Sequence, residues 1–202
     1  MRLWRQSLER PTRFRETRMR VAVLRVGEVD VDVVRRVQKG LCEAFPNTEC
    51  VVPDDVLILP EEAYNAARSQ HHSTTILTKV SNYVKKIDAR IDRVLGVADV
   101  DLYVPRLNFV FGEAECPGKA AVISLFRLKP QFYGRLEDRE LLCERALKEA
   151  VHEVGHTLGL GHCGNSACVM FFSNSIFDTD NKGWVFCESC HRIVVESMTR
   201  RP

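Results

Sequence analysis

The segment that most constrains this chain is residues 152–162, which read HEVGHTLGLGH. Residues four apart lie on one face of a helix, so His152 and His156 can bind the same metal ion. Glu153 lies one step round the helix, where it can act as a general base without becoming a ligand. Gly159 permits a left-handed turn that ends the helix and returns His162 to the same metal. The spacing therefore predicts three imidazole ligands and a fourth position for water, as in a catalytic zinc site.

Half of the eight cysteines follow a second ligand-like pattern, C-x4-C-x18-C-x2-C, formed by Cys163, Cys168, Cys187 and Cys190. Two close pairs joined by a loop suit a closed tetrahedral zinc site with four thiolate ligands. Such a site would stabilise residues 163–190, which are too polar and irregular to bury much core. The two metals should lie about 10–15 Å apart. We expect two zinc ions per chain, one catalytic and one structural, of which the catalytic zinc is more easily lost on purification.

Other interpretations of the cysteines stay open from the sequence. Cys187-Glu-Ser-Cys190-His191 also fits the C-x-x-C-H pattern of haem attachment, which requires export. A thioredoxin-like dithiol is expected near the start of a chain, and this pair is near the end. A zinc ribbon that binds nucleic acid is disfavoured, because residues 163–190 hold one lysine against three acidic residues. His191 could also replace one cysteine as a ligand.

Composition is that of an ordinary globular protein. The chain has 202 residues, 45% hydrophobic and 28% charged, with a net charge of +2. The first 20 residues hold seven arginines and two glutamates, so the rest of the chain is slightly acidic. No stretch is apolar enough for a signal peptide or a membrane span. We therefore expect a cytoplasmic monomer with no nucleic-acid and no membrane partner.

Hydrophobic periodicity predicts an α/β (α+β) fold in which strands and helices alternate before an irregular, cysteine-rich end. The predicted strands cover residues 20–26, 50–59 (one or two short strands), 93–95, 100–104, 107–111, 120–128 and 184–186. The predicted helices cover residues 29–45, 61–68, 73–87, 137–160 and 191–198. Residues 164–182 are predicted to be a loop.

The pattern H-E-x-x-H-x-x-G-x-x-H is the signature of the metzincin zinc peptidases. Together with the four cysteines and Met170, residues 152–190 resemble the archaemetzincins, and residues 97–115 resemble them more loosely. The resemblance implies that the three histidines bind zinc and that Glu153 is the base. It also implies that Met170 is the Met-turn residue beneath the imidazoles, although a core methionine would look the same.

The resemblance further implies a metzincin-like mixed twisted sheet with two long helices, an active-site helix and a cleft. We divide the chain into a basic N-terminal extension (1–18), an N-terminal metzincin subdomain with the active-site helix (19–162) and a C-terminal subdomain with the Met-turn and the four-cysteine zinc site (163–202). The strand at 120–128 is either the sheet edge that pairs with an extended peptide or an ordinary core strand.

The expected function is that of a zinc metallopeptidase, a hydrolase that cleaves a peptide or protein substrate by Glu153-assisted attack of zinc-bound water. The resemblance implies an aminopeptidase-like preference, but the sequence shows no residue set that would capture an N-terminal amine. All four tyrosines precede residue 152, so none downstream can serve as an extra ligand or oxyanion donor. The alternative is a zinc-binding protein without peptidase activity that acts as an interaction module.

Overall fold

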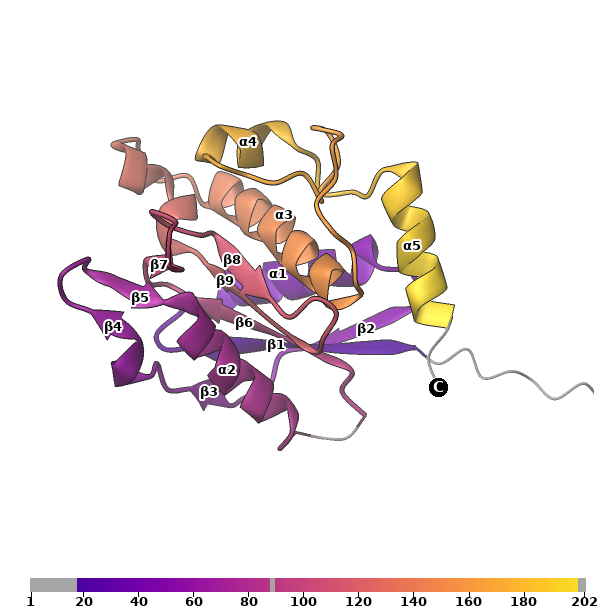
Figure 1. The fold of residues 1–202 in the computed structure, drawn as a ribbon, viewed down its shortest axis with the longest axis horizontal. Coiled ribbons are helices and arrows are strands. Elements are labelled where there is room, and N and C mark those ends of the chain that lie inside the picture. The colour runs from indigo at the N-terminus through magenta and orange to yellow at the C-terminus, as the bar shows by residue number, and fades with distance from the viewer. Residues whose placement is uncertain (1–17, 88–89, 200–202) are drawn as a thin grey trace, which may run out of the picture.

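A six-stranded sheet forms the centre of the computed structural model, which describes residues 18–87 and 90–199 (Figure 1). Its strands are β1 (Met19–Val26), β2 (Thr48–Val51), β3 (Val56–Leu57), β6 (Arg93–Ala98), β8 (Gly112–Ala114) and β9 (Ala120–Ser124). The order is β2-β1-β6-β9-β8, and β3 also pairs with β1. All pairs are parallel except β8 with β9. The short antiparallel strand β8 is therefore an edge of this mixed sheet.

Helices cover both faces of the sheet (Figure 1). They are α1 (Val31–Ala44), α2 (Ser73–Val84), α3 (Arg139–Thr157), α4 (Ile176–Asn181) and α5 (Glu188–Thr199). Successive strand residues point to opposite faces, so Val23 and Leu95 pack toward α1 and α3, whereas Leu24 and Val94 pack toward α2. Each face is apolar, which explains why the strands appear as nearly continuous apolar runs in the sequence.

The helix α3 carries the H-E-x-x-H segment at its C-terminal end. It begins at Arg139 and is capped by Asp138, whose side chain accepts a hydrogen bond from the backbone N–H of Leu141 at 2.9 Å. It ends at Thr157, and Gly159 follows with φ +90°, in the left-handed region that favours glycine. The predicted helix and its stop signal are thus confirmed, with the ends two to three residues inside the predicted limits.

The C-terminal residues pack on the same core as α1 and α3. Val169, Met170, Ile176 and Val194 are buried in that cluster. The predicted division at residue 163 therefore runs through one shared core, and it stays a prediction. Of the predicted extension 1–18, only Arg18 lies within the described residues; the rest lies outside them.

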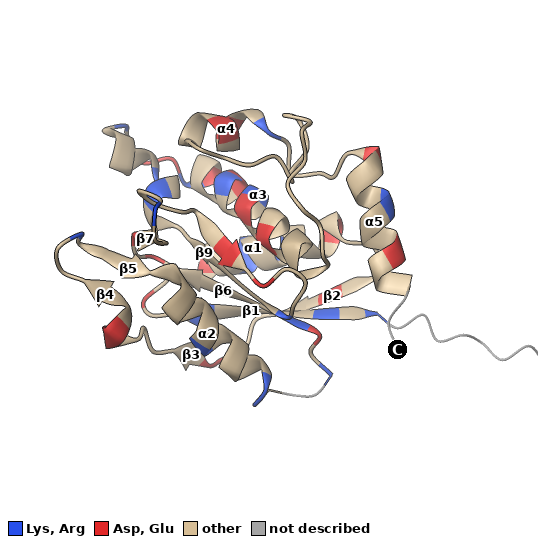
Figure 2. Ribbon diagram, viewed as in Figure 1, with Lys and Arg blue, Asp and Glu red and all other residues tan. Residues whose placement is uncertain are grey.

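A small second sheet lies beside α2 and consists of β4 (Tyr64–Asn65), β5 (Gln70–His72) and β7 (Leu102–Tyr103). Among the described residues, the remaining elements are three 3₁₀ turns: η1 (Glu61–Ala63), η2 (Phe126–Leu128) and η3 (Pro130–Tyr133). Lys and Arg are interspersed with Asp and Glu on α3 and α5 (Figure 2). Within the described part of the chain, no helix is both long and apolar enough to cross a bilayer.

Three predicted elements in the first two thirds of the chain differ from the structure. Instead of a helix, residues 61–65 form η1 and β4 and residues 66–68 form a turn, because β4 pairs with β5 in antiparallel fashion. The strand predicted at 107–111 is irregular, since the Arg68 guanidinium binds the carbonyl oxygens of Leu107 and Asn108. The strand predicted at 120–128 ends at Ser124, whose hydroxyl accepts the N–H of Phe126 and starts a turn.

Two predictions near the C-terminus are also wrong. The predicted loop at 164–182 contains α4, which starts with a capping box formed by Ser175 and Asp178. Residues 184–186 form no strand, and the closing helix begins earlier than predicted, at Glu188. The mixed α/β class, the central sheet and the long helices agree with the prediction.

Candidate active site and metal centres

The three histidines of the motif meet at the C-terminal end of α3. His152 and His156 are one turn apart on this helix, and the turn at Gly159 brings His162 back toward them. Their ligand nitrogens all lie within 4.8 Å of one another. The structure therefore brings together the three residues that the spacing predicted as ligands of one metal.

Hydrogen bonds to the backbone orient the two helical imidazoles. His152 Nδ1 lies 2.8 Å from the carbonyl oxygen of Val169, and His156 Nδ1 lies 2.7 Å from that of Leu160. Because a carbonyl only accepts, both Nδ1 atoms carry the proton and both Nε2 atoms carry a lone pair. These two Nε2 atoms are 3.1 Å apart. Two lone pairs at this separation repel each other unless a cation lies beside them, so the donor set fits a zinc ion.

Burial keeps the imidazoles neutral, as metal ligands must be. Desolvation lowers the pKa of His152, His156 and His162, most strongly at the buried His152. The positive charge of Lys182 lowers all three further.

Glu153 lies beside the histidines and is nearly fully buried, with 5% of its surface exposed. It packs against the edge strand β8 at Gly112. A Cβ at that position would lie 2.6 Å from Glu153 Cγ and 2.7 Å from Oε1, so only glycine leaves room for the carboxylate. Burial raises the pKa of Glu153 well above its usual range, and repulsion from Glu149 adds to the shift. A raised pKa suits a group that must both take up and release a proton.

A cleft of about 310 Å³ gives access to these residues. Its lining includes the three histidines, Glu153, Phe172 and the β8 residues Gly112 to Ala114. No tyrosine is among the residues lining it in the described part of the chain. The ring of Phe172 instead packs on His162, with ring centroids 4.7 Å apart.

Met170 lies fully buried beneath the motif. A Cβ on Gly155, in the turn between the two helical histidines, would lie 2.6 Å from Met170 Sδ. Gly155 thus lets the thioether approach the helix directly. The carbonyl oxygen of Met170 also accepts the N–H of Cys163 at 2.8 Å, which joins this segment to the first cysteine of the second cluster.

The four predicted cysteines form that second cluster. All four are free thiols, and their Sγ atoms lie within 4.8 Å of one another. Cys163 and Cys187 Sγ are 3.8 Å apart, close to the edge of a tetrahedron with zinc–sulfur bonds of about 2.3 Å. Backbone N–H groups donate to the sulfurs, as from Cys187 to Cys168 at 3.3 Å. The N–H of Cys190 lowers the pKa of Cys187 to about 7, which favours the thiolate that binds metal.

Comparison with known proteins decides the family. Residues 22–196, most of the chain, match the model of Peptidase family M54. The chain belongs to this family. It is 47% identical over 172 residues to the archaemetzincin of Methanocaldococcus jannaschii, which covers 85% of this chain and 90% of the relative. It is 51% identical over 138 residues to that of Pyrococcus horikoshii, covering 68% and 72%.

Solved structures agree with this assignment to family M54. The crystal structure of an archaemetzincin from Methanopyrus kandleri aligns with a TM-score of 0.80 at 34% identity, covering 94% of this chain and all of that chain. A zinc-dependent peptidase from Methanocorpusculum labreanum aligns with a TM-score of 0.78 at 29% identity, covering 86% and 99%. The resemblance to archaemetzincins is confirmed, and the predicted mixed α/β fold matches that of the solved archaemetzincin structure. As a member of family M54, the chain is a zinc metallopeptidase. This favours the predicted hydrolase function over the alternative of a zinc-binding interaction module without peptidase activity.

Several residues around the site are not indicated by any motif. The edge of the sheet is β8. The strand predicted at 120–128, for which the sequence leaves an edge or a core position open, is the buried inner strand β9. Glu149 and Lys182 form a buried ion pair below the site. One sequence signal could have found Glu149: it lies four residues before Glu153 and therefore faces the same side of α3.

Proposed function

We propose that this M54 peptidase hydrolyses peptide bonds at the histidine cluster, with Glu153 as general base. The observation that carries the proposal is the facing pair of Nε2 atoms of His152 and His156, 3.1 Å apart, with Glu153 beside them on the same helix. His152, His156 and His162 would hold zinc and leave a position open toward the cleft. When bound, the zinc polarises the substrate carbonyl and lowers the pKa of water.

The residues of the chain supply the remaining steps. An extended peptide would pair with the outer edge of β8, where backbone N–H and C=O groups bind with little regard to sequence. Glu153 would then take a proton from the attacking water at its carboxylate and pass it to the nitrogen of the leaving amine. The close packing of Gly112 and Glu153 fixes the carboxylate next to the strand that would hold the substrate.

The cysteine cluster would hold a second, structural zinc, giving two zinc ions per chain. Met170 would serve as the apolar floor of the histidine site. An aminopeptidase-like preference, a cytoplasmic location, a monomeric state and the lack of nucleic-acid and membrane partners are further parts of the proposal. They rest on the resemblance and on composition.

The test is hydrolysis of a peptide library by the zinc-reconstituted protein and by its Glu153→Ala variant. Loss of the base should lower kcat about 10²- to 10⁴-fold. Metal analysis should find zinc still bound in the variant, which separates loss of the base from loss of the metal. Equal hydrolysis by both proteins would contradict the assigned role of Glu153. An anomalous map should show metal at both clusters.

A further inference from the structure

A second, smaller cavity adjoins the active-site cleft. Its volume is about 50 Å³, and it shares Gly112, His152, Glu153 and Phe172 with the cleft. A site that holds one water needs about 10–15 Å³, so this cavity has room for roughly three to four heavy atoms. That is the size of a small side chain, in the place where a substrate residue next to the scissile bond would enter.

The walls of the cavity are aromatic and held from behind. Phe109 and Phe111 line it and pack edge to face, with centroids 5.1 Å apart. The guanidinium of Arg127 lies 4.5 Å from the Phe109 ring centroid. Arg127 is itself fixed by two hydrogen bonds to Asp101, of 2.6 and 2.8 Å. The walls therefore cannot widen easily for a large side chain.

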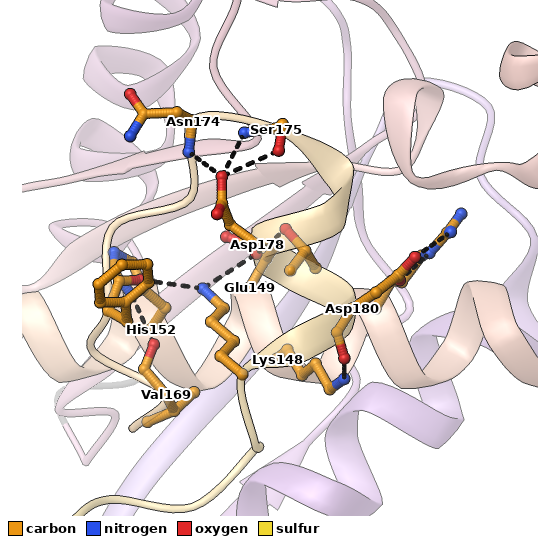
Figure 3. Close-up of polar contacts among 12 residues, drawn as sticks. Lys148, Glu149, His152, Val169, Asn174, Ser175, Asp178 and Asp180 are labelled. Carbon is orange, nitrogen blue, oxygen red and sulfur yellow. Dashed lines mark hydrogen bonds and ion pairs between the residues drawn. The ribbon is translucent and has the colours of Figure 1, made fainter. Parts of the chain in front are cut away.

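Besides His152 and Glu153 of the active site, the polar part of the lining consists of Glu149 and Ser173. The side chain of Glu149 is 4% exposed, and its Oε1 accepts the Thr179 hydroxyl at 2.9 Å and lies 3.1 Å from Lys182 Nζ (Figure 3). The two described contacts of the Glu149 side chain, with Thr179 and with Lys182, are therefore both made by Oε1. Ser173 Oγ is buried and has no hydrogen-bond partner among the described residues.

Lys182 cancels the charge of Glu149 from behind the cavity. Its side chain is fully buried, does not line the cavity, and also contacts the carbonyl oxygen of Phe171 at 3.4 Å. A lone buried carboxylate would attract a cationic side chain, whereas a paired one presents no net charge. The ion pair thus keeps Glu149 from adding a net charge to the cavity, which Glu153 also lines.

We propose that this cavity receives the substrate side chain next to the scissile bond, and that the Glu149–Lys182 pair restricts it to small, uncharged side chains such as alanine and serine. Glu149 and Lys182 are thus specificity-determining residues, and Ser173 offers a hydrogen bond to a substrate hydroxyl. The inference rests on the proposed hydrolysis at the histidine cluster and names the substrate class of that site.

The test measures binding directly, independently of turnover. Isothermal titration of the zinc-loaded full chain would use peptide hydroxamates that differ only in the side chain next to the hydroxamate. The side chains are alanine, norvaline, 2,4-diaminobutyrate and phenylalanine. Norvaline and diaminobutyrate have the same size and differ in charge. The wild type should bind alanine and norvaline at least tenfold more tightly than either phenylalanine or diaminobutyrate.

Changing the ion pair should change the charge preference alone. Lys182→Met removes the cation and keeps a side chain of similar length. The affinity for the diaminobutyrate hydroxamate should therefore rise at least tenfold relative to that for the norvaline hydroxamate. The matched control is Lys148→Met, because Lys148 is also a buried lysine but binds Glu144 and the Asp180 carbonyl instead. If Lys182→Met fails to fold, Glu149→Gln is the second variant, which leaves the Lys182 cation unpaired. In this variant the affinity for the peptide hydroxamate with aspartate next to the hydroxamate should rise tenfold relative to that for its asparagine counterpart.

The outcomes separate this inference from the proposed function. Hydroxamates that bind in the predicted order to a protein that hydrolyses no peptide would support the cavity and contradict the proposed function. Affinities that ignore side-chain size and charge, or no binding by any member, would overturn the cavity proposal. The same holds if Lys148→Met shifts the preference as much as Lys182→Met does.

Discussion

In the histidine cluster and in the cysteine cluster alike, the ligand atoms lie within 4.8 Å of one another, but different parts of the chain bring them together. Two of the three histidines come from one helix, and the third follows six residues later. The cysteines are spread over residues 163–190 and come from loops and the start of α5. Closing the longer segment costs more chain entropy. A metal at the cysteines would therefore contribute mainly to folding, whereas the helix already builds the histidine site without one.

The largest expected effect that tests this contrast is on catalysis. His162→Ala removes the one exposed ligand of the histidine cluster and should lower activity at least about 10³-fold, or about 4 kcal/mol. Zinc content should fall from two to one per chain. Because little packing is lost, the melting temperature should stay nearly the same. His191→Ala, at another exposed histidine, is the control and should change neither activity nor zinc content.

The second effect is on stability. Cys187→Ser removes one thiolate of the closed site and should reduce the free energy of unfolding by about 3 kcal/mol, which corresponds to roughly 6–12 °C in melting temperature. Calorimetry and metal analysis would measure both changes. The exposed Cys116→Ser is the control and should melt like the wild type. Loss of folding in His162→Ala but not in Cys187→Ser would reverse the roles of the two clusters.

A smaller effect is expected from the contact between the edge strand and the base. Gly112→Ala places a Cβ within 2.7 Å of Glu153 and of the Val122 carbonyl oxygen, so the carboxylate must move. We expect kcat to fall about tenfold, or about 1.4 kcal/mol, with both metals retained. Gly164→Ala has open space around it and serves as the control. An unchanged kcat in Gly112→Ala would show that the position of Glu153 is less critical than proposed.

The smallest effect concerns pH. Because burial lowers the pKa of all three histidines below the usual 6.5, protons compete weakly with zinc for these nitrogens. Lowering the pH from 7.5 to 6.0 should therefore change the zinc content of the histidine cluster less than twofold. Equilibrium dialysis followed by metal analysis measures this. Release of most of that zinc already at pH 6.0 would contradict the expectation that burial protects the three imidazoles from protonation.

Local patterns were enough to predict the elements that depend on short-range geometry. The spacing of His152 and His156 on a helix, the stop at Gly159 and the return of His162 all follow from helix periodicity and glycine's access to positive φ. The cysteine spacing likewise indicated one cluster. Predictions failed where a distant partner decides the backbone, as in the segment 107–111, whose carbonyl groups are bound by Arg68.

The sequence by itself determined the ligand types, the helix that carries them and the family resemblance, because these depend on residues close together along the chain. The tertiary structure alone decided that β8 is the edge strand, that Gly112 makes room for Glu153, and that Lys182 meets Glu149 beneath a small cavity. These contacts join residues 33 to 41 positions apart. No local periodicity encodes them, because they arise only when the sheet, α3 and the α4 segment pack into one core.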